Sequence, residues 1–180
     1  MDFIEFEKLV KERQSCRDFN DIPLEREKVE KIVDLARLAP SACNSQPWKM
    51  YVATTPEKVK EVVTPLTEGG RNIFLKKAKA VIIVTEKDAE NLKEDVKKRF
   101  SLDYFVKYDV GELIAYLTLG AKAIGVESII IGWINLEALL KTVGAEKGER
   151  VALAVALGYS DAPLREKTRK PKEKTVKYLD

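Results

Sequence analysis

Two continuous apolar stretches of strand length limit the folds that this chain can adopt. They are AVIIVT at residues 80–85 and VALAVAL at residues 151–157, and Gly158 closes the second. A strand with one wet face alternates apolar and polar residues, so an unbroken apolar run is typical of a strand buried on both faces. The chain is therefore expected to build one sheet that is flanked by helices.

The other segments supply the helices and further strands. Apolar residues at helical spacing predict helices, and shorter apolar runs predict strands, in these ranges: helices at 3–14, 24–38, 56–66, 109–124 and 135–142, strands at 48–53 and 126–131. Residues 88–107 are charged, and a mixture of helix and loop is expected there. Strands and helices do not alternate regularly, so the predicted class is α+β. We expect a single domain over residues 1–180, with a central, mostly antiparallel mixed sheet of roughly four to five strands.

The composition excludes several catalytic chemistries. The chain has no histidine and two cysteines, Cys16 and Cys43. This excludes Ser-His-Asp and Cys-His catalysis and the usual zinc and iron sites. An enzyme of this composition would rely on carboxylates or on a cofactor. The two thiols are expected to be free, in a reducing compartment.

The chain is expected to be soluble and cytoplasmic, and its charge is spread unevenly. The N-terminal segment is charged, and no apolar run approaches the roughly 20 residues that span a bilayer. Abundant Lys and Glu favour a thermophilic source. The net charge is +3, but residues 165–177 hold seven basic and two acidic side chains, so this segment carries +5 and the rest −2. Such a basic segment predicts an anionic ligand, which could be nucleic acid, a membrane surface or a single phosphate.

Three polar segments are candidates for binding one anion. In the first, Arg13 and Arg17 are four residues apart, so on a helical turn they share a face. Their two guanidinium groups and the Ser15 hydroxyl suit a phosphate. The alternative is two solvated arginines at the end of a helix, and spacing alone favours that alternative.

The second candidate segment is the loop that joins helix 24–38 to strand 48–53. Its Ser41, Asn44 and Gln46 side chains can bind a ligand or cap their own backbone. A capped turn is the favoured interpretation of the loop taken alone.

The third candidate segment is the basic C-terminal one, with Lys167, Arg169 and Lys170. Taken alone, it is expected to be a solvated or disordered terminus. Gly132 follows a predicted strand, where a glycine lets a ligand approach the backbone closely. The alternative there is a plain strand end with Trp133 packed on the core.

Taken together, the order of these motifs resembles the flavin-dependent nitroreductase family. The matching motifs are R-x-S-x-R at 13–17, Asp18-Phe19, A-P-S-A-x-N-x-Q-P-W at 39–48, Gly132-Trp133, Leu157-Gly158-Tyr159 and K-x-R-K-P at 167–171. The resemblance covers nearly the whole chain. The block at 39–48 is its specific part, while the C-terminal motif is weak by itself.

The resemblance implies an interlocked homodimer with two FMN molecules at the subunit interface. One set of residues would hold the phosphate and ribityl chain: Arg13, Ser15, Arg17, Lys167 and Arg169. Another set would come from the other subunit and line the ring: Pro40, Ser41, Ala42 and Asn44. Gln14 and Gln46 join these sets as cofactor-binding residues. Asn72 would reach the pyrimidine edge, and the backbone of Ile131 and Gly132 would face the reactive nitrogen of the ring.

The implied activity is that of an FMN-dependent NAD(P)H oxidoreductase with a ping-pong mechanism. NADH or NADPH would transfer a hydride to the flavin and leave, and a nitroaromatic, a quinone or another small electron acceptor would then take its place. Two alternatives remain, a flavin-binding protein without turnover and a dehydrogenase or dehalogenase relative. Binding to nucleic acid or membrane is not expected, because the basic residues are not interleaved with stacking aromatics and no spanning segment is present.

Overall fold

The computed structural model describes residues 2–132 and 135–179, and its centre is a four-stranded sheet. The strands are β1 (Trp48–Ala53), β2 (Ala80–Glu86), β3 (Glu127–Ile131) and β4 (Arg150–Gly158). Their order is β1-β2-β4-β3, and every neighbouring pair is antiparallel. The two long apolar stretches are the two central strands, as their sequence predicts, and the α+β class is confirmed.

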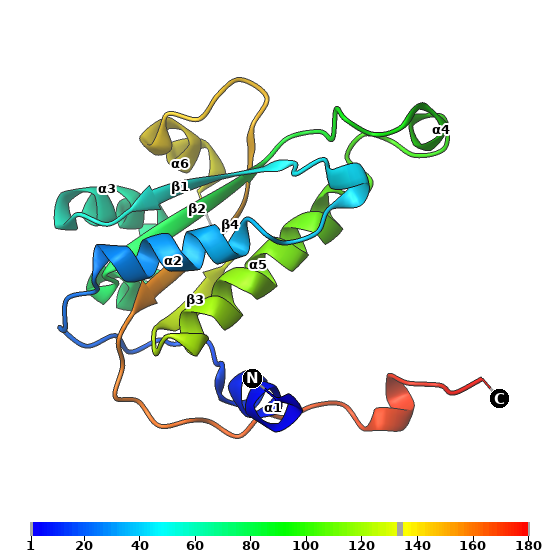
Figure 1. Ribbon diagram of the computed structural model, residues 1–180. Coiled ribbons are helices and arrows are strands. Elements are labelled where there is room, and N and C mark those ends of the chain that lie inside the picture. The colour runs from blue at the N-terminus through cyan, green and yellow to red at the C-terminus, as the bar shows by residue number, and fades with distance from the viewer. Residues whose placement is uncertain (1, 133–134, 180) are drawn as a thin grey trace.

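Helices cover both faces of this sheet (Figure 1). On one face lie α2 (Arg26–Ala36) and α5 (Val106–Ala123), and on the other α3 (Pro56–Leu66) and α6 (Leu136–Val143). Successive residues of a strand point to opposite faces, so each central strand contributes to both cores. Ile82 and Val84 pack with α2 and α5, whereas Val81 and Ile83 pack with α3 and α6.

Helix α5 crosses one face of the sheet from end to end. Its 18 residues give it a length of about 27 Å. A side chain at Gly120 would place a Cβ 2.6 Å from Cδ2 of Leu35 on α2, so the glycine allows the two helices to pack closely. The N-terminal end of α5 lies near the 41–46 loop, and its C-terminal end lies near α1 (Phe3–Glu12) (Figure 1).

Two parts of the chain carry less regular structure. In the charged segment expected to mix helix and loop, α4 (Glu94–Lys97) is a single turn among turns and loops. After β4 the chain is extended apart from one short turn at Lys172–Lys174, and the C-terminal segment projects away from the sheet (Figure 1). Among the helices of residues 2–132 and 135–179, none is both long and apolar enough to cross a membrane.

Candidate functional site

A cluster of cationic side chains lies where the end of α1 meets the C-terminal segment. This cation cluster consists of Arg13, Lys167 and Arg169. Lys167 Nζ donates a hydrogen bond to the carbonyl of Val10 in the last part of α1, at 2.6 Å. Burial, and then the positive charges of Arg13, Arg169 and Lys122, lower the pKa of Lys167. The chain thus brings together two of the three predicted segments, the first and the third.

This cluster is short of negative charge. Lys122, on the last turn of α5, pairs with Glu127 at 2.5 Å. Within the part of the chain that the structure describes, no carboxylate pairs with Arg13, Lys167 or Arg169. Like charges held together without counterions disfavour one another, so an anion bound among them would be stabilised. Sequence analysis missed Lys122, because a lysine near the end of a helix has an ordinary role at the helix dipole.

The 13–17 segment is held beside the edge strand β3. Ser15 forms a parallel bridge with Ser128, and the Cys16 N–H donates to the Ser128 carbonyl at 2.9 Å. The exposed Arg17 lies two residues beyond Ser15. Ile131 ends β3 and Gly132 follows it, so they lie about 10 and about 13 Å from this bridge. The cation cluster and the backbone of Ile131 and Gly132 therefore lie along one edge of the sheet.

Gln14, which is predicted to bind the cofactor, has hydrogen-bond partners within the chain. Its Nε2 donates to the Pro163 carbonyl at 3.2 Å, and its Oε1 accepts from the Arg165 N–H at 3.1 Å. The Arg165 guanidinium also donates to the carbonyl of Ser15. Gln14 and Arg165 thus tie the C-terminal segment to the 13–17 segment. Sequence analysis missed Arg165, since one arginine in a basic run carries no signal for a contact 150 residues away.

Asn72 also makes a contact within the chain. It has a left-handed backbone, with φ +48°, and its Nδ2 donates to the carbonyl of Leu66, the last residue of α3, at 3.1 Å. Nearby, Asn135 donates to Glu68 at 2.5 Å, which places the start of α6 in this region. Trp133, part of the predicted Gly132-Trp133 motif, lies outside the described residues.

The 41–46 loop has an unusual backbone that its own side chains stabilise. Cys43, Asn44 and Gln46 have φ of +53°, +53° and +46°, a region that residues other than glycine seldom adopt. The Ser41 hydroxyl accepts from the Gln46 N–H at 3.0 Å, and Gln46 Nε2 donates to Asn44 at 3.2 Å. The capped turn, which was the favoured interpretation of the loop taken alone, is therefore present. Pro40, Cys43, Asn44 and Gln46 remain exposed, so the capped loop still presents groups to a ligand.

In one chain, this loop is far from the cation cluster. The Ala42 N–H donates to Asp109 at the start of α5, whereas Lys122 is near the end of that helix. The two positions are thirteen residues apart along the helix, which is about 20 Å. A ligand that contacts both groups closely would need the loop of a second copy of the chain.

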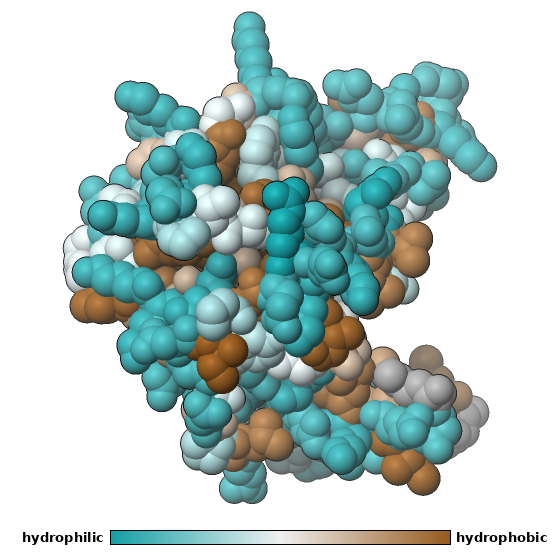
Figure 2. Space-filling model, turned by 60° about the vertical axis from the view of Figure 1, so that its left-hand side comes forward, coloured by the Kyte–Doolittle hydropathy of each residue, from teal (hydrophilic) through white to brown (hydrophobic). Residues whose placement is uncertain are grey.

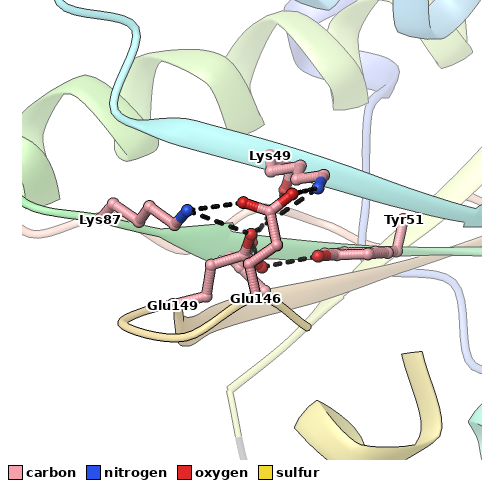
Figure 3. Close-up of polar contacts among 6 residues, drawn as sticks. Lys49, Tyr51, Lys87, Glu146 and Glu149 are labelled. Carbon is pink, nitrogen blue, oxygen red and sulfur yellow. Dashed lines mark hydrogen bonds and ion pairs between the residues drawn. The ribbon is translucent and has the colours of Figure 1, made fainter. Parts of the chain in front are cut away.

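A separate polar cluster joins β1, β2 and the loop before β4 (Figure 3). Glu149 has a buried side chain whose Oε2 accepts from the Tyr51 and Thr85 hydroxyls, at 2.7 and 2.9 Å. Glu146 lies between Lys49 and Lys87, at 2.5 and 2.7 Å, and hydrogen bonds from both lower the pKa of Glu146 to about 2. With its charges paired, this cluster serves to hold the loop on the sheet.

Comparison with known proteins gives a consistent set of matches. A model described as "Nitroreductase family" matches residues 10–93 and 58–159. A protein of Archaeoglobus fulgidus, provisionally named NADH dehydrogenase/NAD(P)H nitroreductase, is 29% identical over 156 residues, which are 84% of this chain and 83% of that one. The oxygen-insensitive NADPH nitroreductase of Helicobacter acinonychis is 24% identical over an alignment of 214 residues, with 99% and 100% coverage. A solved Staphylococcus epidermidis structure, provisionally named NAD(P)H:FMN oxidoreductase, superposes with a TM-score of 0.80 at 23% identity, covering 97% of this chain and 95% of that one.

Proposed function

This chain belongs to the nitroreductase family, and we propose that it is a cytoplasmic, FMN-dependent oxidoreductase that passes electrons from NADH or NADPH to a small acceptor. Relatives named for NAD(P)H-dependent nitroreduction support an oxidoreductase in general. The observation that carries FMN in particular is the cation cluster of Arg13, Lys167 and Arg169. These side chains come from opposite ends of the chain and have no carboxylate partner among the described residues.

The residues fit a phosphate monoester. Its dianion would offset the mutual repulsion of the three cations and would accept charge-assisted hydrogen bonds from guanidinium and ammonium groups. The Ser15 hydroxyl and Arg17 lie on the same segment and would extend the contacts toward a ribityl chain. About 13 Å separates the Ser15–Ser128 bridge from Gly132 along β3, and that is the scale of an FMN molecule from its phosphate to the middle of its ring.

The backbone of Ile131 and Gly132 would lie beside the ring. FMN, when bound, supplies the redox chemistry, which is consistent with a chain without histidine. Gly132 is exposed at the end of β3, so its peptide groups can meet a ligand, and a backbone N–H acts as a hydrogen-bond donor without titrating. Asn72, from the neighbouring region after α3, remains a candidate for the pyrimidine edge.

We propose a homodimer, because one chain leaves this site incomplete. Pro40, Ser41, Ala42, Asn44 and Gln46 would come from the second copy, since their own loop is about 20 Å from their own cation cluster. Exposed apolar residues support such an interface: Phe3 and Ile4 are 77% and 73% exposed, and Tyr178 and Leu179 are 69% and 85% exposed. Figure 2 shows apolar residues on the lower part of the molecule, which holds α1 and the C-terminal segment. Patches of this kind mark contact surfaces.

The acceptor would be small and would use the same face as the nicotinamide. A nitroaromatic is consistent with the names of the relatives, and a quinone is the second candidate. A ping-pong order follows if the donor leaves before the acceptor binds.

The visible absorption spectrum of the purified protein tests this function. We expect flavin bands that bleach on anaerobic addition of NADPH or NADH and return when a quinone is added. The same protein heated and filtered should release FMN at one molecule per chain. Flavin bands that persist with both donors would contradict the oxidoreductase and leave a flavin-binding protein. A colourless protein that takes up no FMN would contradict the cofactor itself.

A further inference from the structure

A buried carboxyl group lies under the 41–46 loop. Asp109, on the first turn of α5, is only 5% exposed. Its Oδ1 accepts a hydrogen bond from the Ala42 N–H at 3.1 Å. Its Oδ2 is buried without a hydrogen-bond partner in the described chain, and so is the Oγ of Ser45 in the loop. Two orphaned polar atoms therefore lie at one junction between helix and loop.

The burial of Asp109 requires an explanation beyond the helix dipole. An acidic residue in the first turn of a helix is favourable, but an exposed one serves that purpose equally well. Burying a carboxylate is costly unless hydrogen bonds compensate. Burial raises the pKa of Asp109, the hydrogen bond from the Ala42 N–H opposes that effect, and the nearby Glu112 carboxylate adds to it. Burying the Asp109 carboxyl group thus costs free energy, and the buried group contacts the 41–46 loop.

That loop needs an anchor. Cys43, Asn44 and Gln46 have left-handed backbones, which are strained for residues with a Cβ. The hydrogen bonds from Asn44 N to Ser41 O and from Ser45 N to Ala42 O close the loop on itself. They do not set its position on the protein. The Ala42–Asp109 hydrogen bond joins the closed loop to the most buried helix of the fold.

We propose that Asp109 is a positioning residue, which holds the 41–46 loop in the conformation that meets FMN across the dimer. This rests on the proposed function. Asp109 acts through Ala42 and does not itself touch the ligand. The strained segment at Cys43 and Asn44 then reaches the ring in a preorganised state, which lowers the entropic cost of binding.

The chain contains its own reporter for this loop. Cys43 is exposed on the loop, whereas Cys16 is buried. The rate at which a thiol reagent such as dithionitrobenzoate labels Cys43 therefore reports on the conformation of the loop in the folded protein. We expect Asp109→Ala to change the labelling rate of Cys43 by at least several-fold and to raise the FMN dissociation constant about tenfold. Asp109→Asn keeps an oxygen acceptor for Ala42 and adds a donor for Ser45, so it should restore both values to near wild type.

Controls separate positioning from general damage. Glu112→Ala removes a neighbouring charge that, in the described part of the chain, makes no hydrogen bond or ion pair with the loop, and it should change neither value. Ala42→Pro removes the N–H donor at the first position of the turn, where proline is tolerated, and should reproduce Asp109→Ala if that variant does not fold. Wild-type labelling and FMN affinity in Asp109→Ala, or in Ala42→Pro, would overturn the proposal.

The outcome also separates this inference from the proposed function. If wild-type protein binds no FMN but Asp109→Ala still changes the labelling of Cys43, the flavin role falls and the anchoring of the loop stands. If FMN binds and Asp109→Ala binds it equally well, the proposed function stands and the positioning role is overturned.

Discussion

At the scale of single residues, Lys167 is the most informative member of the cation cluster. Its ammonium group holds the end of α1 through Val10, and its pKa is lowered by burial and by the positive charges around it. An anion bound nearby would oppose that shift, since it favours the charged form. Lys167 therefore joins the C-terminal segment to the first helix, and it would join both to a bound anion.

Substitution of Lys167 should weaken FMN binding in a pH-dependent way. Loss of a charge-assisted contact predicts that Lys167→Met raises the FMN dissociation constant by about 10- to 100-fold. Because the pKa in the free protein lies below that of an ordinary lysine, wild-type affinity should decline as the pH rises toward it. Lys167→Arg should keep the affinity and lose this alkaline decline. Fluorescence titration with FMN measures both effects, and Lys174→Met, in the exposed C-terminal segment, is the matched control. Equal affinity in Lys167→Met and wild type would remove Lys167 from the site.

At the scale of elements, a glycine decides how the 13–19 segment packs on the sheet. A Cβ at Gly158, the end of β4, would lie 2.8 Å from Cδ1 of Phe19, which is completely buried. At Gly120 on α5, the Cβ would meet the end of the Leu35 side chain, which is 42% exposed and free to rotate. At both glycines an added Cβ would lie very close to a neighbouring side chain, but only the side chain next to Gly120 can move away.

Gly158→Ala should destabilise the protein, whereas Gly120→Ala should be nearly neutral. Overpacking against a fixed buried ring is expected to cost about 1–3 kcal/mol of unfolding free energy. At Gly120 the rotation of Leu35 and the better helix propensity of alanine offset the contact. Denaturant unfolding of both variants measures the difference. Equal stabilities would show that Phe19 moves as freely as Leu35.

The elements were the most predictable part of this structure, and the polar contacts were the least. Strand 48–53 and helix 56–66 were predicted with their observed bounds, because apolar periodicity and the proline at the helix start are local signals. Helix α5 begins at Val106, three residues before its predicted start. The burial of Asp109, at the predicted start of helix 109–124, and of Glu149 was not predicted. Their burial depends on loops that fold over them, which no local pattern reveals.

At the scale of the whole molecule, the proposed site depends on the C-terminal segment. Up to Arg169 it supplies Arg165 and two members of the cation cluster, and beyond Pro171 it supplies exposed apolar residues such as Tyr178.

Two truncations separate these roles. A chain that ends at Ala162 should lose FMN and much of its dimer, because it loses both the cations and the apolar end. A chain that ends at Pro171 should keep FMN binding in concentrated solution and dissociate more readily on dilution. Light scattering coupled to gel filtration, with absorbance at flavin wavelengths, reads mass and cofactor together. If the chain ending at Ala162 elutes as a yellow dimer, the C-terminal segment has neither role; if the two truncations behave alike, the cluster does not depend on Lys167 and Arg169.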